Sequence, residues 1–305
     1  MSLHLRILGS SASAPAFNRH HTAQVLELHN HKILIDCGEG TQLLLRKYGY
    51  KLSKITHILI SHLHGDHYFG LMGIISTMNL YGRTASLKLI GPPGLSEIIP
   101  MHLKYSNTTL NFDIDLDEWT PGGSEVLYEN SQYYIAQVPL EHRVDCSGYC
   151  IREKPKKRRI NKELFPTQIP PNQIMDLKNG IDVKDGEGNV IYPYQEYTLH
   201  PKPAYSYAFC SDTRYTESIL PYIQGVDLLY HEATFMETQK ERAAQTFHST
   251  SKEAATIAKL ADASKLIVGH FSNRYKDLKP LLEEAREVFP ATELALEGSA
   301  FTINY

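Results

Sequence analysis

The chain has 305 residues, and its 42% of hydrophobic residues can fill one large α/β domain or two ordinary ones. A formal net charge of −3 excludes a protein that binds nucleic acid through a basic surface over the whole molecule, so an anionic partner must be held by a local patch or by metal. Four cysteines are too few for a disulfide framework, and no apolar run approaches the roughly 20 residues of a membrane span, so we expect a reduced, cytoplasmic protein with no membrane partner.

In chain order, short apolar segments alternate with helical patterns and turn signals, which predicts an α/β layered fold. Strands are expected at Leu3–Leu8, Gln24–Leu28, Lys32–Ile35, Ile55–Ile60, Leu87–Ile90, Tyr133–Val138, Tyr205–Cys210, Val226–Tyr230 and Lys265–Val268. Helices are expected at Thr41–Tyr48, Tyr68–Ile75, Ser251–Leu260 and Leu278–Val288.

One segment interrupts this alternation. Residues 153–203 are rich in Pro, Lys, Arg, Asn and Gly, and basic residues are concentrated between Lys154 and Lys162. A connection of this length is unusual inside a compact domain and is often functional or separately folded. We therefore expect a single catalytic domain over residues 1–305 that carries an inserted, projecting arm at 153–203.

A turn rich in histidine follows the apolar run Ile58–Ile60 and contains three imidazoles and a carboxylate. Side chains alternate faces in an extended segment, so His62 and His64 point the same way. Asp66 and His67 follow a glycine that allows a sharp bend, and they can serve a second metal beside the first. Imidazole with carboxylate suits zinc, and also iron or manganese. A polar loop that is histidine-rich by chance is the competing interpretation.

Further candidate ligands follow other predicted strands, because α/β folds place active sites at the carboxyl ends of strands. These candidates are Asp36, His142, Asp212 and His270. Taken singly, His142 could be a surface histidine and Asp212 a helix cap. Their recurrence at separate strand ends favours a site for two metals, which a short carboxylate such as Asp212 can bridge.

These residues resemble the metallo-β-lactamase superfamily and, within it, the ribonuclease Z family, zinc endonucleases that trim the 3′ end of precursor tRNA. The superfamily resemblance rests on His62-x-His64-x-Asp66-His67, then His142, Asp212 and His270. The narrower resemblance spans nearly the whole chain and rests on the segments Asp36–Gln42, Pro139–His142 with Gly148-Tyr149, Ser211–Thr213, His231–Phe235, His248–Thr250 and His270–Tyr275.

The resemblance implies a four-layered αβ/βα metallo-β-lactamase sandwich that binds two Zn²⁺ ions per subunit. It assigns one ion to His62, His64 and His142. It assigns the other ion to Asp66, His67 and His270, with Asp212 as the bridge between the ions. Asp36 is then expected to orient a ligand imidazole rather than bind metal.

The same resemblance implies a reaction in which the 3′ trailer of precursor tRNA is cut off and a 3′ hydroxyl stays on the tRNA. Asp66 would orient the attacking water or take its proton. His248, paired with Glu232, would donate a proton to the leaving oxygen, since a carboxylate favours the charged imidazole. The segment after His248 also reads as a helix start, which is compatible with this role.

RNA contacts are expected from several basic residues. Arg19 lies in a loop that resembles one contacting the substrate near the cleavage site, and Arg274 could hold a phosphate or pair with a carboxylate. The arm resembles a tRNA-binding exosite, in which Lys156, Lys157, Arg158 and Arg159 would contact backbone phosphates. A solvated charge run is the plainer interpretation of these four residues. The resemblance also implies a homodimer.

Two other functions compete with this one. A different hydrolase of the same fold, acting on a thioester, a lactam or a small phosphodiester, would share the metal ligands but would not need the basic arm or the His248 segment. A catalytically silent RNA-binding relative would be expected to have lost ligands, whereas all seven candidate ligands are present here.

Overall fold

The computed structural model describes residues 2–165 and 169–304, and these fall into two compact units. The first unit, called the body, contains residues 2–152 and Tyr205–Asn304. The second unit, Glu153–Ala204, contains the arm segment 153–203. Each unit has its own hydrophobic cluster, so each is described by itself.

Within the described residues, the body contains two mixed sheets of seven strands each. The first sheet has the order β18 (Ala300–Ile303), β1 (Leu3–Gly9), β2 (Ala23–Leu28), β3 (His31–Ile35), β4 (His57–Leu59), β5 (Leu87–Gly91) and β6 (Ile114–Glu118). The second sheet has the order β17 (Thr292–Leu294), β16 (Leu266–Gly269), β15 (Leu228–Glu232), β14 (Ser206–Cys210), β9 (Ser147–Glu153), β8 (Tyr133–Pro139) and β7 (Val126–Glu129). In each sheet, neighbouring parallel strands carry the motif segments at their carboxyl ends.

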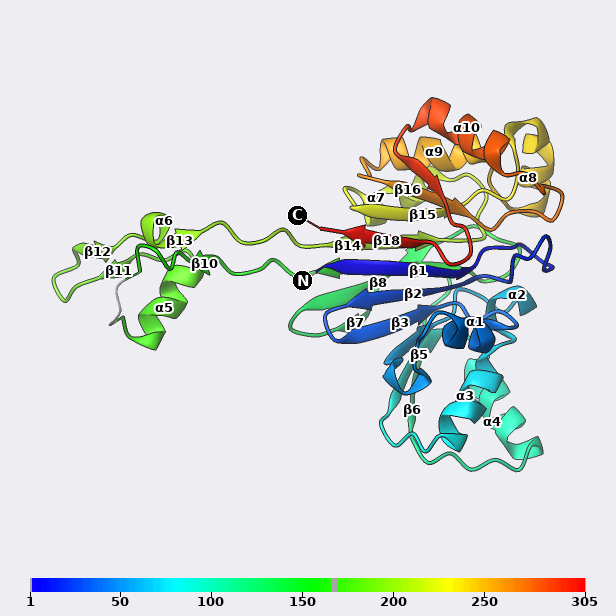
Figure 1. Cartoon of the computed structure of the whole chain (residues 1–305), viewed down its shortest axis with the longest axis horizontal. Coiled ribbons are helices and arrows are strands. Elements are labelled where there is room, and N and C mark those ends of the chain that lie inside the picture. The colour runs from blue at the N-terminus through cyan, green and yellow to red at the C-terminus, as the bar shows by residue number, and fades with distance from the viewer. Residues whose placement is uncertain (1, 166–168, 305) are drawn as a thin grey trace. The chain divides into compact units, whose positions relative to one another are not determined.

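Helices cover the outer face of each sheet (Figure 1). Beside the first sheet lie α1 (Thr41–Lys47), η1 (Leu52–Lys54), α2 (Gly65–Tyr68), α3 (Leu71–Leu80) and α4 (Leu95–Tyr105). Beside the second sheet lie η2 (Glu217–Ile219), α7 (Leu220–Ile223), η3 (Glu237–Gln239), α8 (Lys240–Thr246), α9 (Ser251–Leu260) and α10 (Lys279–Val288). None of the helices in the described part of the chain is both long and apolar enough to cross a membrane.

Three apolar clusters hold these layers together. One cluster lies between the sheets and contains large buried side chains such as Tyr149, Tyr207 and Phe209. The other two clusters fill the spaces between each sheet and its helices, for example where the alanines of α9 meet Leu229 and Val268. The predicted four-layered αβ/βα sandwich is therefore confirmed for the body.

Apart from one helical pattern, the strands and helices expected from the sequence are present in the body, with ends that differ by at most two residues. One expectation was wrong in detail, because the helical pattern Tyr68–Ile75 does not form one continuous helix. The backbone N–H of Gly70 donates to the Cys37 carbonyl at 2.8 Å, and a Cβ on Gly70 would lie 2.4 Å from the Gly38 carbonyl oxygen. This close approach to the β3 exit separates α2 from α3.

The second unit has short elements around a small core. They are β10 (Arg159–Ile160), α5 (Pro171–Lys178), β11 (Val183–Lys184), β12 (Val190–Tyr192), α6 (Tyr194–Tyr197) and β13 (Thr198–Leu199). β10 pairs with β13, and β11 pairs with β12, both antiparallel. Ile169, Leu177 and Val183 are buried, with several tyrosines packed against them. A cluster of this size stabilises a small unit only modestly.

Candidate metal centre

The candidate ligands come from strand exits of both sheets of the body. The β4 exit carries His62, His64, Asp66 and His67, and the exits of β8, β14 and β16 carry His142, Asp212 and His270. Asp36, Asp212 and His270 have φ values of 55°, 55° and 57°, in the left-handed region that such residues rarely adopt. Strained backbone of this kind clusters at functional sites, where the surrounding fold enforces it.

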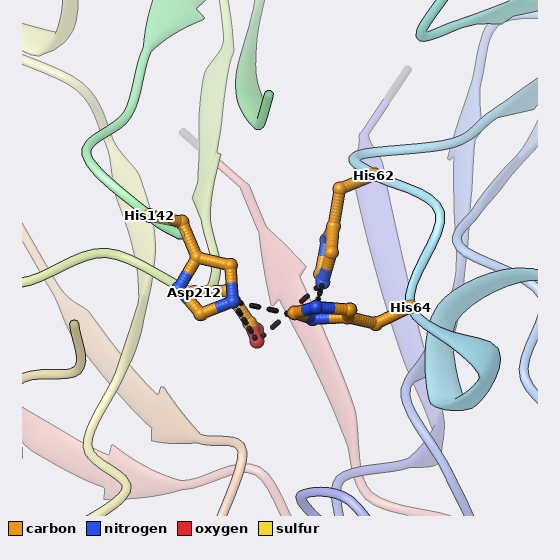
Figure 2. Close-up of side chains that lie close together, drawn as sticks. All are labelled: His62, His64, His142 and Asp212. Carbon is orange, nitrogen blue, oxygen red and sulfur yellow. Dashed lines mark hydrogen bonds and ion pairs between the residues drawn. The ribbon is translucent and has the colours of Figure 1, made fainter. Parts of the chain in front are cut away.

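One group of ligand atoms is formed by His62, His64, His142 and Asp212 (Figure 2). Their donor atoms all lie within 4.8 Å of one another. His64 Nδ1 lies 3.0 Å from His62 Nε2 and 3.2 Å from His142 Nε2. Three imidazole nitrogens and a carboxylate oxygen at this spacing match the ligand types and number of a four-coordinate zinc site.

A second group is formed by Asp66, His67 and His270, and Asp212 faces both groups. Asp212 Oδ1 lies 3.3 Å from His67 Nε2 and 3.2 Å from His270 Nε2. Its other oxygen, Oδ2, lies 3.7 Å from His62 Nε2 and 3.8 Å from His142 Nε2. Each carboxylate oxygen of Asp212 is thus directed at one set of imidazoles, as a carboxylate bridging two cations would be.

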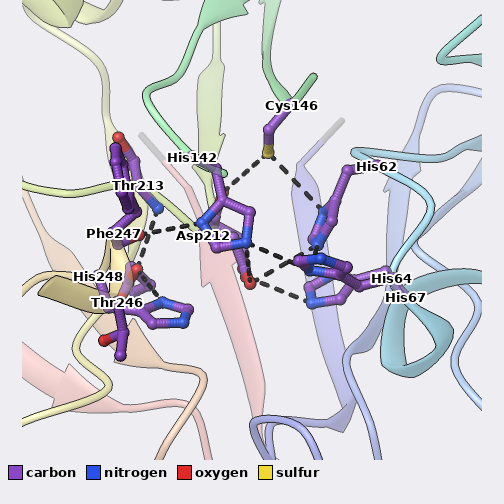
Figure 3. Close-up of polar contacts among 12 residues, drawn as sticks. His62, His64, His67, His142, Cys146, Asp212, Thr213, Thr246, Phe247 and His248 are labelled. Atoms are coloured by element: carbon purple, nitrogen blue, oxygen red, sulfur yellow. Dashed lines mark hydrogen bonds and ion pairs between the residues drawn. The ribbon is translucent and has the colours of Figure 1, made fainter. Parts of the chain in front are cut away.

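The outer ring nitrogens of four of these histidines have partners that orient the rings. His67 Nδ1 lies 2.6 Å from Asp36 Oδ2, the contact that an orienting role of Asp36 requires, and His270 Nδ1 lies 3.0 Å from the Thr234 hydroxyl. His142 Nδ1 donates to the Phe247 carbonyl at 3.0 Å (Figure 3). His62 Nδ1 lies 3.0 Å from the Ser61 hydroxyl. Partners of this kind leave Nε2 of each ring free to bind a metal.

The protonation states of the clustered side chains favour the binding of cations. Burial lowers the pKa of His62 well below its usual value and that of His142 to about 4, so both rings are neutral donors at pH 7. Burial alone would raise the pKa of Asp212, but the imidazoles of His270 and His67 hold it well below its usual value. Several buried carboxylates in one place are costly unless positive charge is added. The donor set therefore fits bound divalent metal.

His248 and Glu232 form a buried pair beside these groups. His248 Nδ1 lies 2.7 Å from Glu232 Oε1, and Glu232 also accepts hydrogen bonds from the backbone N–H groups of Thr213 and Thr234. Burial disfavours the charged form of His248, but the Glu232 carboxylate raises its pKa to about 9. A pKa of about 9 keeps the His248 imidazole protonated at neutral pH. One ring nitrogen of His248 lies within 4.8 Å of donor atoms of Asp212 and His270, so His248 is close to the candidate metal ligands.

The two arginines predicted to contact RNA have different environments. Arg19 is 8% exposed, and its guanidinium donates to the Tyr275 carbonyl at 2.6 Å, so it anchors the loop that carries it. Arg274 is exposed, and within the described residues its guanidinium has no ion pair. Of the two readings of Arg274, this environment suits a phosphate better than a carboxylate of the chain itself.

The four basic residues of the arm also differ in their exposure and contacts. Lys157 and Arg159 are exposed, although Lys157 Nζ contacts Met175 Sδ at 3.0 Å and Arg159 Nε donates to the His200 carbonyl at 3.2 Å. Arg158 is half-buried and lies over the Tyr194 ring at 4.9 Å, and its Nε donates to the Thr198 hydroxyl at 2.6 Å. Lys156 pairs with Glu153 at 2.6 Å. Arg158 and Lys156 therefore hold the second unit together, and Lys157 and Arg159 present charge to solvent.

Sequence reasoning missed several contributors to the site. The Phe247 carbonyl and the Thr234 hydroxyl orient ligand histidines, and neither belongs to a residue type that signals metal binding. A cavity of about 440 Å³ beside the ligands is also lined by His21, Phe69 and Arg143, none of which was predicted. His21 lies two residues after Arg19, and this position beside a predicted RNA-contacting residue is the signal in the sequence that could have indicated it.

Comparisons with known proteins agree with this geometry. The chain is 48% identical to the ribonuclease Z of Cytophaga hutchinsonii over 304 residues, covering 100% of this chain and 97% of the relative. The chain belongs to the ribonuclease Z family. It is also 41% identical to the ribonuclease Z of Bacteroides thetaiotaomicron, covering 98% of this chain and 95% of the relative. The resemblance to the ribonuclease Z family drawn from the sequence is confirmed.

Solved structures place this ribonuclease Z family member in the metallo-β-lactamase fold. Human tRNase Z, short form, superposes with a TM-score of 0.71 at 26% identity, covering 99% of this chain and all of that one. The metallo-β-lactamase fold protein YhfI from Bacillus subtilis superposes with a TM-score of 0.70 at 18% identity, covering 99% and 100%, and shows the fold alone. A family model described as anti-Pycsar protein Apyc1 matches residues 3–117, which is less than half of the chain.

Proposed function

We propose that this ribonuclease Z family member is a zinc-dependent endoribonuclease that removes the 3′ trailer of precursor tRNA and leaves a 3′ hydroxyl on the tRNA. The observation that carries the proposal is the convergence of the complete ligand set with the His248–Glu232 pair at one edge of the sandwich. The relatives at 48% and 41% identity are named ribonuclease Z, and the similar human structure is a tRNase Z.

Two Zn²⁺ ions per subunit suit the two groups of donor atoms. His62, His64 and His142 would hold one ion, Asp66, His67 and His270 would hold the other, and Asp212 would bridge them. When bound, such a pair of ions supplies a hydroxide nucleophile at neutral pH and stabilises charge on the phosphate oxygens. Support comes from the two oxygens of Asp212, each of which faces a different set of imidazoles.

The protein's own side chains would handle the protons. Asp66 Oδ2 accepts a hydrogen bond from the Ser13 backbone N–H at 2.7 Å, which fixes the carboxylate in a position to orient the attacking water or take its proton. His248 would donate a proton to the leaving ribose oxygen, and Glu232 would keep that imidazole charged and correctly oriented. The two groups therefore have opposite roles, one as base and one as acid.

Precursor tRNA is the proposed partner, bound partly at the arm. Lys157 and Arg159 offer exposed charge for backbone phosphates, whereas Lys156 and Arg158 would support them by holding the second unit in shape. Near the centre, Arg274 would contact a phosphate, and Arg19 would act on the substrate through the loop that it anchors. We further propose that the protein is a cytoplasmic homodimer.

A substrate panel tests this function. Zinc-loaded protein is given a precursor tRNA with a 3′ trailer, a thioester and a bis-aryl phosphodiester, and each product is quantified. We expect the precursor to be cut once, with a 3′ hydroxyl on the tRNA product, at a much higher kcat/KM than the other two compounds. Efficient thioester turnover beside an uncut precursor would contradict the proposal.

A further inference from the structure

A cavity of about 440 Å³ opens beside the candidate metal centre, and the metal ligands form only part of its wall. Asp66, His64 and Asp212 line the cavity, so a phosphodiester held at the centre would extend into it. His21 and Phe69 line the same cavity, and the assignments above give neither a role in the reaction. The chemistry of these two side chains indicates what the cavity binds.

Phe69 presents an aromatic face that the backbone holds in place. Its side chain is 65% exposed, so the ring is accessible to a ligand in the cavity. A Cβ on Gly65 would lie 2.3 Å from a ring carbon of Phe69, so the ring packs directly over the Gly65 backbone. Tyr68 contacts the ring edge at a centroid distance of 5.1 Å. These contacts support one side of the ring, and the exposed part of Phe69 is accessible for stacking.

His21 lies in the wall of the same cavity. It is 7% exposed, and within residues 2–165 and 169–304 neither ring nitrogen makes a hydrogen bond of ordinary geometry, although both nitrogens are buried and the Ser13 backbone lies close to the ring. A Cβ on Gly38 would lie 2.4 Å from His21 Cβ and 2.4 Å from the Asp66 carbonyl oxygen, so glycine lets the His21 loop pack against the Asp66 turn. A buried imidazole costs stability unless its donor and acceptor find partners, so a ligand in the cavity that the ring turns to meet would stabilise it.

We propose that Phe69 and His21 form a subsite for one nucleobase of the RNA, on a nucleotide next to the scissile phosphodiester. Phe69 stacks on the base, and His21 hydrogen-bonds to its edge. Stacking on an aromatic ring suits any base, whereas an imidazole donor and acceptor can discriminate among base edges. This inference rests on the proposed function, since it requires an RNA substrate at the centre.

The test combines variants of the protein with changes in the RNA. Two precursor tRNAs each carry one abasic nucleotide, either just 5′ or just 3′ of the cleaved bond. Single-turnover cleavage and RNA affinity are measured for wild-type protein, Phe69→Leu, Phe69→Tyr and His21→Ala. Tyr105→Leu is the matched control, because Tyr105 is an aromatic residue that is 81% exposed and does not line the cavity.

We expect one of the two abasic positions to lower wild-type cleavage and affinity by about 5- to 100-fold, the range for one stacked base. Phe69→Leu and His21→Ala should each lower cleavage and affinity on the intact RNA. On that abasic RNA they should lower cleavage and affinity little beyond the loss that the missing base already causes. Phe69→Tyr and the control Tyr105→Leu should both show the wild-type cleavage and affinity, with the same loss on the abasic RNA.

The proposal is contradicted if the fold-losses in cleavage and affinity caused by Phe69→Leu and by the missing base multiply at both abasic positions. It is likewise overturned if wild-type protein binds and cleaves both abasic RNAs as well as the intact one. Affinity tests the subsite even when wild-type protein leaves the intact precursor uncut, and that outcome would contradict the proposed function separately.

Discussion

At the scale of single residues, the site depends on backbone conformations that few residues tolerate. Asp36, Asp212 and His270 each adopt a left-handed conformation where a strand ends, which turns the side chain back toward the cluster. Their neighbours then determine the charge of each group, as Glu232 does for His248. The chemistry of the site therefore follows from pairs of residues rather than from isolated ones.

Glu232→Gln should change the pH dependence of RNA cleavage. The carboxylate raises the pKa of His248 to about 9, so its removal lowers that pKa and His248 loses its proton at a lower pH. Because the protonated imidazole is the proposed acid, the alkaline limb of the pH–rate profile should move to lower pH, with a loss of about tenfold or more at pH 8.

The control for this variant is Glu293→Gln, which removes an exposed carboxylate paired with Lys265 at a sheet edge. It should leave the profile unchanged. Metal content is measured for both variants. An alkaline limb that stays in place in Glu232→Gln, with metal content intact, would rule out His248 as the acid that Glu232 supports.

At the scale of elements, short turns place the candidate ligands, and the segment that enters β10 carries the basic residues of the second unit. β4 ends just before His62, and α2 begins at Gly65, so ligands that are close in sequence face one centre. In the second unit, the pairing of β10 with β13 leaves Arg159 exposed while Arg158 packs on Tyr194. Arg158, which precedes β10, and Arg159, its first residue, therefore lie in different environments.

The double variant Lys157→Ala with Arg159→Ala should weaken binding of precursor tRNA and reduce its dependence on salt. Each phosphate contact adds roughly one to the slope of log affinity against log salt, so the slope should fall by about two. Affinity is measured over a salt series. Lys51→Ala with Lys54→Ala, which removes the same charge from exposed positions of the body, should keep the wild-type slope. Equal slopes for all three proteins would contradict RNA binding by these arm residues.

At the scale of the whole molecule, each sheet supplies part of the candidate metal centre. The first sheet provides the candidate ligands from His62 to His67, and the second provides the candidates His142, Asp212 and His270. A bound metal therefore joins the two halves of the sandwich, and neither half has a complete ligand set. Metal binding should consequently contribute to the stability of the body as well as to catalysis.

Removal of metal with a chelator should lower the midpoint of thermal unfolding, and added zinc should restore it. A ligand that binds only the folded state at 1,000 times its Kd stabilises that state by about 4 kcal/mol. Asp212→Asn, which alters the proposed bridge, should show a smaller difference between the zinc-loaded and chelated forms. The same midpoint with and without chelator in the wild-type protein would argue against metal binding at this centre.

Local patterns in the sequence were sufficient to predict the fold class, the family and much of the candidate site. The turn from His62 to His67 predicts a metal site by itself, because ligand spacing within one turn is a local property. The strand alternation likewise predicts an α/β fold, and the ordered motifs predict the family that the relatives confirm. Only tertiary structure could decide that the Phe247 carbonyl orients His142, that Arg19 is buried, and that His21 and Phe69 share a cavity with Asp66. These contacts join residues that are far apart in the chain, so their geometry depends on how the two sheets pack and not on any short segment.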